Sequence, residues 1–224
     1  METKDIDFSK LSPMMKQYFK VKNKYKNHIL FYRLGDFYEM FFDDAIIASR
    51  ELELTLTGRD CGLEERAPMC GVPHHACDVY LKKLIEKGYN VAICEQTMDP
   101  AMCKGIVPRE VIRVVTPGTL IESSMLDETS NNYICAFYMR AKESALCLAD
   151  ISTGEVHLFE FEGKEMTSSA INELSRFSPA EILINDAFLS NKELSSFIRE
   201  KLKTSVQLLE AVSYTHLTLP TTER

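Results

Sequence analysis

The sequence predicts an α/β protein of two domains, and two observations carry this prediction. Along residues 11–121, apolar runs with strand spacing alternate with amphipathic stretches that have helix spacing. A polar, acid-rich segment at 122–131 then precedes a second strand-rich region. We expect a first domain at 1–121, in which helices flank a mixed sheet, a linker at 122–131, and a second domain at 132–211. A chain of 224 residues is long enough for each domain to bury a core.

The first domain opens with a helix start, because Ser12 can cap a helix whose first residue is Pro13. We expect this helix to run to about residue 25. Gly88 is expected to end a later helix. The other elements follow from periodicity and turn residues: strands at 29–34, 54–59, 89–96 and 110–118, helices at 41–53 and 76–87, and a loop at 60–75 rich in glycine, proline and charge.

The second domain starts with three consecutive strand candidates, YICAFYMR, SALCLADIS and EVHLFEFEG, joined by short turns as an antiparallel meander. A helix near 167–176, a strand AEILIN and a helix near 188–202 complete a βββαβα order. That order resembles the ribonuclease H type of fold. The tail at 212–224 does not continue the pattern, and we expect it to be foreign or frame-shifted, which leaves the second domain truncated.

Composition places the chain among ordinary globular proteins, with 45% hydrophobic and 26% charged residues. No apolar run approaches the roughly 20 residues that cross a membrane, and the start METKDIDFSK has no apolar signal region. The seven cysteines are scattered without a disulfide pattern. We therefore expect a cytoplasmic location and no membrane partner.

The charge is unevenly distributed. The net charge is −7, yet residues 8–35 contain no acid and several lysines. Such a basic block indicates a local anionic partner, because counterion release depends on the contact surface rather than on net charge. A solvated helix face is the alternative. The candidate phosphate contacts are Lys22, Lys24, Arg33, Arg59 and Lys104.

The stretch FYRLGDFYEMFF, residues 31–42, crowds aromatic rings around one acid. Gly35 and Asp36 form a turn, and the two-residue period of an extended chain then places Phe37 and Glu39 on one side. Core packing is one interpretation. The other is a surface that inserts a ring between stacked bases and contacts a base with the acid, since a buried carboxylate costs several kcal/mol unless it is paired. The residues alone leave both interpretations open.

Three long motifs resemble the MutS family of DNA mismatch repair proteins, in the same order. They are FYRLGDFYEMFFDDA, RAPMCGVPHHACDVYLKKLIEKGYNVAICEQTMDP and KGIVPREVIRVVTPGT. The resemblance is dense over residues 11–121 and looser to about residue 210, over what would be the connector domain of that family.

The resemblance implies a function for the aromatic stretch. Phe37 matches the family's intercalating phenylalanine, which enters the minor groove of kinked duplex DNA at a mispaired or unpaired base. Glu39 matches the acid that hydrogen-bonds this base, and we expect its carboxyl group to be protonated when bound. The implied partners are double-stranded DNA with mismatches or small insertion/deletion loops, MutL through the connector, and a second copy in a homodimer of the full-length protein.

By the same resemblance, this chain is not itself an enzyme. The family's ATPase domain lies outside it, so no cofactor is expected here, and ATP and Mg²⁺ belong to the full-length protein. Neither GxxxxGK[ST] nor GxGxxG occurs in the chain. The alternative function is a nuclease or a nucleotide-processing enzyme on an α/β core, but Asp150 and Glu155 are too few carboxylates for two-metal cleavage.

No metal site is expected. Cys70, His74, His75 and Cys77 lie close together in the sequence, but their spacing lacks the CxxC pair of a closed zinc site. We expect these residues in a loop that leads into the following helix.

Overall fold

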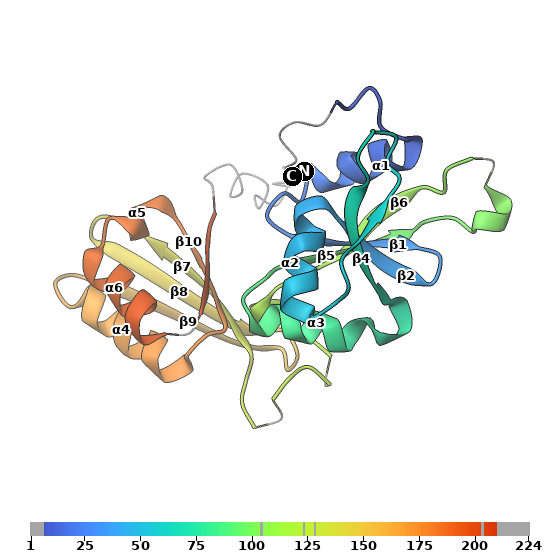
Figure 1. Cartoon of the computed structure of the whole chain (residues 1–224). Coiled ribbons are helices and arrows are strands. Elements are labelled where there is room, and N and C mark those ends of the chain that lie inside the picture. The colour runs from blue at the N-terminus through green and yellow to red at the C-terminus, as the bar shows by residue number, and fades with distance from the viewer. Residues whose placement is uncertain (1–6, 104, 123, 128, 203, 210–224) are drawn as a thin grey trace, which may run out of the picture. The chain divides into compact units, whose positions relative to one another are not determined.

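The computed structural model describes residues 7–103, 105–122, 124–127, 129–202 and 204–209. The chain divides into two compact units, Met1–Thr116 and Pro117–Arg224, and each has its own sheet and helices (Figure 1). The predicted mixed α/β class is confirmed. The domain limits and the linker at 122–131 stay predictions.

The described residues of the first unit form a six-stranded sheet in the order β3-β4-β2-β1-β5-β6. Strand β1 is parallel to β5, and every other neighbouring pair is antiparallel, so the sheet is mixed as predicted. The strands are β1 Ile29–Leu34, β2 Phe37–Phe41, β3 Thr57–Arg59, β4 Ala67–Pro73, β5 Val91–Gln96 and β6 Arg109–Val115.

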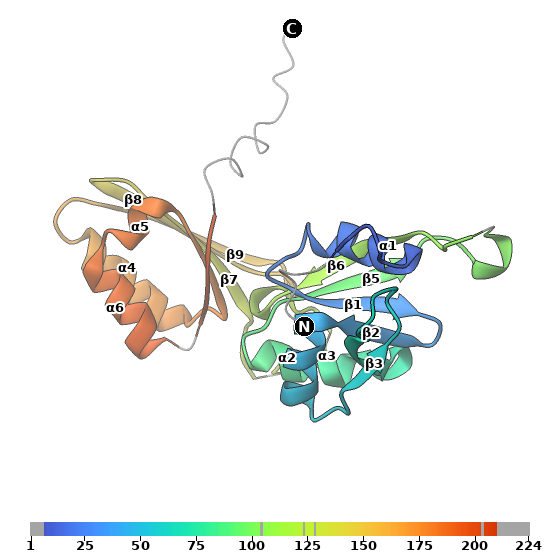
Figure 2. The same cartoon turned by 45° about the horizontal axis from the view of Figure 1, so that its top comes forward.

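Helices cover both faces of this sheet, with α1 on one face and α2 and α3 on the other (Figure 2). Tyr18 of α1 packs edge-on against Tyr32 and Phe41, with ring centroids 5.4 and 5.1 Å apart, which holds the helix over β1 and β2. Ser12 caps α1 as predicted, since its Oγ accepts a hydrogen bond from the Met15 N–H at 3.5 Å. The helices are α1 Pro13–Lys22, α2 Phe42–Leu52 and α3 Cys77–Glu86, with 3₁₀ turns at His74–Ala76 and Pro100–Met102.

The predicted loop at 60–75 is wrong over much of its length, because Ala67–Pro73 form β4 between β3 and β2. Proline and glycine in this segment are typical of turns, and they mask a strand in which Cys70 and Val72 are buried. The neighbouring predictions are right in type and differ in extent. Strand β3 covers only the second half of the predicted 54–59, and α1 ends three residues before the expected end.

The described residues of the second unit form a five-stranded sheet in the order β11-β10-β7-β8-β9. Strands β7, β8 and β9 pair as the predicted antiparallel meander, while β10 is parallel to both β7 and β11. This arrangement agrees with the ribonuclease H type of fold that the element order predicts. The strands are β7 Tyr133–Met139, β8 Glu143–Asp150, β9 Glu155–Glu162, β10 Glu181–Ile184 and β11 Ser205–Leu208.

All the described helices of this unit pack on one face of its sheet, where their apolar side chains meet Phe137, Leu146 and Ile182 in a core (Figure 1). The predicted helix at 188–202 is two helices, because Asn191 ends one turn and caps the next. Strand β11 was not predicted, and the tail at 212–224 lies outside the described residues. The helices are α4 Met166–Phe177, α5 Asp186–Leu189 and α6 Lys192–Lys201, with a 3₁₀ turn at Pro117–Thr119.

Candidate nucleic-acid interface

Strands β1 and β2 form a hairpin that presents Phe37 at its tip. Leu34 pairs with Phe37, and only Gly35 and Asp36 connect the two strands. Gly35 has a φ of +58°, a conformation that glycine adopts without strain, and no atom lies near the position of a Cβ. The backbone therefore favours glycine here. Phe37 is 47% exposed although it is large and apolar.

The tip of the hairpin is also tied to β4. Phe37 pairs with Pro73 on that strand, and the backbone N–H of His74 donates to the Asp36 carbonyl oxygen at 2.9 Å. The His74 Nδ1 lies 3.1 Å from the same oxygen. Neighbours on both sides therefore hold the backbone that carries the exposed ring.

Tyr38 points to the other face of the sheet, as the two-residue period predicts. It is buried, its hydroxyl hydrogen-bonds to the Glu95 carboxylate, and the Arg33 guanidinium lies over its ring at 5.6 Å. Burial and the neighbouring Glu95 raise the pKa of Tyr38, so its hydroxyl stays a neutral donor. This side chain anchors β2 beneath the exposed phenylalanine.

Glu39 lies on the same side of β2 as Phe37, and its side chain is 14% exposed. Its Oε2 is 2.5 Å from Nη1 of Arg59, at the end of β3. On the adjacent strands Glu39 is paired with Tyr32 and Gly71. The structure thus joins two residues that the sequence offered as separate candidates, a base contact and a phosphate contact.

The five candidate phosphate contacts differ in their surroundings. Three of the five are in ion pairs with carboxylates of the same unit, Lys24 is exposed, and Lys104 lies outside the described residues. These ion pairs depend on the tertiary fold, since each carboxylate is at least twenty residues away from its cation in the chain. The ion pairs are Lys22–Asp44 at 2.8 Å, Arg33–Glu95 at 3.3 Å and Arg59–Glu39 at 2.5 Å.

A basic groove between α1 and β6 has no counterpart among the sequence predictions. It has a volume of about 500 Å³, and Lys20, Lys24 and Arg109 are among its lining residues. Arg109 is held in place, because its Nε donates to the Arg33 carbonyl oxygen at 2.7 Å and its Nη1 to Oε1 of Gln17 at 3.1 Å. No local sequence pattern joins segments about ninety residues apart.

In the Cys70, His74, His75 and Cys77 cluster, the two cysteines are buried, His74 is half-buried and His75 is exposed. Cys70 is buried, and burial together with the nearby Asp44 raises the pKa of its thiol to about 12, which disfavours the thiolate that binds metals. Within the described parts of the chain, no three His, Cys, Asp or Glu side chains gather closely enough to hold a metal ion.

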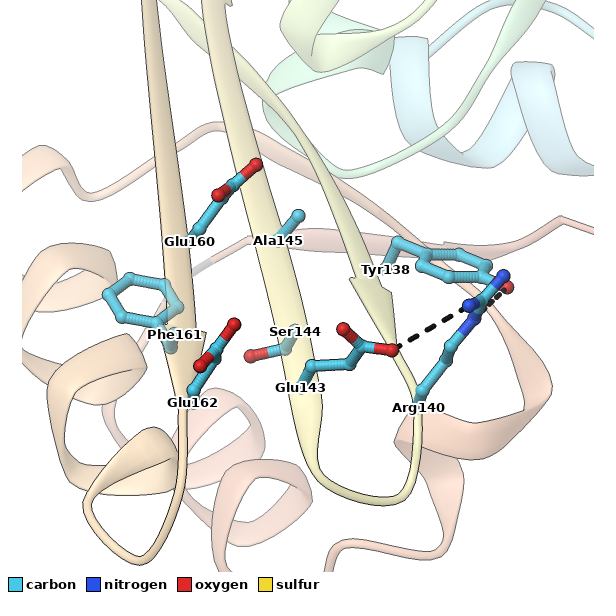
Figure 3. A pocket seen from close by; sticks show the side chains of 8 residues that line it. All are labelled: Tyr138, Arg140, Glu143, Ser144, Ala145, Glu160, Phe161 and Glu162. Atoms are coloured by element: carbon cyan, nitrogen blue, oxygen red, sulfur yellow. Dashed lines mark hydrogen bonds and ion pairs between the residues drawn. The ribbon is translucent and has the colours of Figure 1, made fainter.

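The second unit has a pocket of about 210 Å³ over β7, β8 and β9 (Figure 3). Glu143, Glu160 and Glu162 line it, and the Arg140 Nη1 lies 3.6 Å from Oε1 of Glu143. Two-metal cleavage of nucleic acid requires carboxylates that converge on one point. Within the part of the chain that the structure describes, Glu143, Glu160 and Glu162 do not gather closely enough to hold a metal ion.

Two protein-family models match the chain, one over each part of it. A family model described as MutS domain I matches residues 12–124, and one described as MutS domain II matches residues 132–221. The chain belongs to the MutS family. Its first unit, with Phe37 at the hairpin tip, corresponds to domain I, and its second unit to domain II.

Curated relatives agree with this assignment. The chain is 51% identical over 204 residues to the DNA mismatch repair protein MutS of Ruminiclostridium cellulolyticum, which covers 91% of the chain and 23% of the relative. It is 55% identical over 174 residues to the protein of that name from Alkaliphilus oremlandii, covering 78% of the chain and 20% of the relative. The chain thus spans about a quarter or less of the length of these relatives.

Among the described helices of the chain, none is long and apolar enough to cross a membrane.

Proposed function

We propose that the chain recognises mispaired or unpaired bases in duplex DNA and acts in mismatch repair as the DNA-contacting part of a longer protein. One observation carries the proposal: the exposed ring of Phe37 stands at the tip of a tethered hairpin, in the unit that matches MutS domain I. The relatives that the chain matches are named DNA mismatch repair proteins.

Phe37 is the residue that enters the base stack. Inserting a ring into duplex DNA costs a few kcal/mol per unstacked step, so insertion is favourable where the stack is already weak. A tip held by β1 and β4 resists being pushed back into the protein. Selectivity for a mismatch then arises because paired DNA resists the kink more strongly than mispaired DNA does.

Glu39 contacts the base beside the inserted ring. It lies two residues from Phe37 on the same side of β2, which is the placement that a joint contact requires. A protonated carboxyl group can donate to a base nitrogen, whereas a carboxylate can only accept. An unprotonated acid facing an anionic duplex repels it, so the Glu39 contact favours DNA only where it forms a hydrogen bond.

Exposed lysines of α1 and of the turn that follows it contact the phosphates that flank the inserted ring. Lys24 is the exposed member of the predicted set, and Lys20 lines the same basic groove. Contacts of this kind position the protein without reading sequence, and they make binding salt-dependent. Lys22 and Arg33 are excluded from this role in the proposal, because carboxylates of the protein already pair with them.

The remaining partners belong to the longer protein. We propose that the second unit contacts MutL, that the full-length protein works as a homodimer, and that ATP and Mg²⁺ bind a domain outside this chain. A cytoplasmic, DNA-associated location follows from that role.

The decisive experiment compares binding to matched and mismatched duplexes of the same length. It uses the 224-residue chain, and also a chimera in which the chain replaces the matching segment of the R. cellulolyticum relative. We expect a preference for the mismatch that Phe37→Ala removes. Phe8→Ala is a matched control, because Phe8 is 48% exposed in the same unit and should leave the preference intact. A chimera without mismatch preference, or one that keeps it after Phe37→Ala, contradicts the proposal.

The rival enzymatic function has its own test. Labelled duplex is incubated with the chain and Mg²⁺, and the products are separated by size. Mismatch-selective binding without cleavage supports a recognition module, and cleavage that increases with protein concentration and survives repurification supports the nuclease.

A further inference from the structure

The ion pair between Arg59 and Glu39 joins two strands that are not neighbours. Arg59 ends β3, Glu39 lies in β2, and β4 runs between them. The residue of β4 opposite Glu39 is Gly71, where a Cβ would lie only 3.5 Å from Cγ of Glu39 and 3.3 Å from the Tyr38 carbonyl oxygen. The absence of a side chain there leaves space over β4 beside the Glu39 side chain.

The two side chains differ in exposure. The Glu39 side chain is 14% exposed, and the Arg59 side chain is 38% exposed. The carboxylate therefore depends on the guanidinium for a charged partner, while the guanidinium still reaches solvent. Close pairing of opposite charges also removes most of the field that a lone carboxylate presents to an approaching anion.

We propose that Arg59 is the positioning residue of Glu39: it holds the carboxyl group beside Phe37 and, while that group is ionised, offsets its negative charge, so that this face of the sheet accepts a duplex. The inference rests on the proposed function, because it assumes that Glu39 faces DNA. It assigns to Arg59 an action through Glu39, in place of the phosphate contact that the sequence predicts.

The two roles of Arg59 predict different couplings, which a double-mutant cycle measures. If Arg59 positions Glu39, Arg59→Ala weakens binding to mismatched duplex about tenfold or more when Glu39 is present, and by less than about twofold in the Glu39→Gln background. If Arg59 contacts a phosphate, its removal causes the same loss in both backgrounds and lowers the salt slope of binding by about one.

The cycle is measured in the chimera described above, at several salt concentrations, on matched and mismatched duplexes. Arg59→Lys keeps the charge, so we expect it to bind the mismatched duplex more tightly than Arg59→Ala does. If Arg59 only supported the fold, Glu39→Gln would not reduce the loss of affinity that Arg59→Ala causes. Arg66→Ala is the matched control. Arg66 is an exposed arginine in the loop after β3, and its Cβ lies 3.1 Å from the position that a Cβ on Gly58, the neighbour of Arg59, would occupy. It should change affinity equally with and without Glu39→Gln.

Additive losses for Arg59→Ala and Glu39→Gln overturn the positioning role, provided that circular dichroism shows both variants folded. That outcome differs from failure of the proposed function, in which the parent chimera has no mismatch preference or keeps it after Phe37→Ala. A chimera that shows the preference and loses it with Phe37→Ala, while the Arg59 cycle is additive, retains the function and rejects the role of Arg59.

Discussion

The ammonium of Lys22 lies 2.8 Å from Oδ1 of Asp44, and both side chains are largely buried, at 16% and 6% exposed. The other oxygen of Asp44 accepts the backbone N–H of Leu30 at 3.0 Å. A single carboxylate of α2 therefore connects α1 with β1. This network occupies a lysine that the basic character of residues 8–35 offered as a DNA contact.

Lys22→Met is expected to destabilise the first unit by about 3–5 kcal/mol, because it leaves the Asp44 carboxylate buried without its charged partner. Lys24→Met is the control, since Lys24 is exposed and a substitution there should stay within about 0.5 kcal/mol. Urea unfolding followed by circular dichroism measures both. Equal stability of the two variants would show that the buried ion pair does not hold α1.

The same variant has a defined pH dependence. Burial raises the pKa of Asp44, against the opposing effects of Lys22 and the Leu30 N–H. A group whose pKa is raised on folding contributes stability below its unfolded pKa, and that contribution is lost as the pH rises through the folded value. The defect of Lys22→Met should therefore be largest at neutral pH and shrink in acid, where Asp44 is protonated. Stability curves at several pH values below neutrality test this, and a defect that grows in acid contradicts it.

The pKa of Asp150 in the second unit is shifted in the opposite direction to that of Asp44. Burial acts to raise its pKa, but hydrogen bonds from Ser152, Asn132 and Thr153 outweigh burial and lower it. Its contribution to stability is present above the unfolded pKa and is lost as the pH falls through the folded pKa. We expect Asp150→Asn to cost about 1–3 kcal/mol at neutral pH, with a smaller difference in acid.

Hydrogen exchange of amides in β7 and β8 measures the effect of Asp150→Asn within its own unit. Asp127→Asn provides the control, because Asp127 accepts bonds from the Thr129 N–H and hydroxyl in a similar turn that is exposed. Equal changes in exchange for the two variants would mean that burial of Asp150 adds nothing.

Gly35 tests the geometry of the hairpin tip. No neighbouring atom opposes a side chain there, so the φ of +58° alone sets the cost of substitution. Gly35→Val should destabilise the hairpin by about 1–2 kcal/mol, whereas Gly35→Asn should cost less, because asparagine adopts this conformation more readily. Thermal unfolding ranks the variants, and a valine variant as stable as the asparagine one would reject the argument.

Gly118 is constrained by space instead. A Cβ there would lie 2.8 Å from the Cβ atoms of Glu181 and Ile134, so Gly118→Ala should cost about 1–3 kcal/mol through overpacking. Gly154→Ala meets open space at a φ of +77°, and its cost of about 1 kcal/mol comes from the backbone. Exchange rates in β10 distinguish them, since crowding at Gly118 should accelerate exchange beside Glu181 and Gly154→Ala should not.

Elements with a strong local pattern could be predicted from the sequence. Strand β1 matches the predicted 29–34 in full, because an apolar run bounded by a turn is a complete local signal. Strand β4 was missed because its prolines and glycine match a turn pattern, and pairing with β2 and β3 overrides that local preference. The break at Asn191 was missed because one capping residue gives a weak signal inside a helical pattern.

The candidate site divides in the same way. The shared side of Phe37 and Glu39 follows from the two-residue period of a strand, which is a local property. The partners of Lys22, Arg33 and Arg59 depend on which strands and helices come together, and charge patterns along the chain do not contain that information. The sequence therefore identifies the cations without distinguishing those that remain accessible.

The tethered hairpin has a thermodynamic consequence for the proposed recognition. A phenylalanine on a mobile loop would lose backbone freedom on insertion, and the protein would bear much of the entropic penalty of binding. Phe37 stands on a two-residue connection between paired strands, so its backbone is already ordered before contact. The distortion is then left to the nucleic acid, and differences in affinity between duplexes report the stiffness of the DNA.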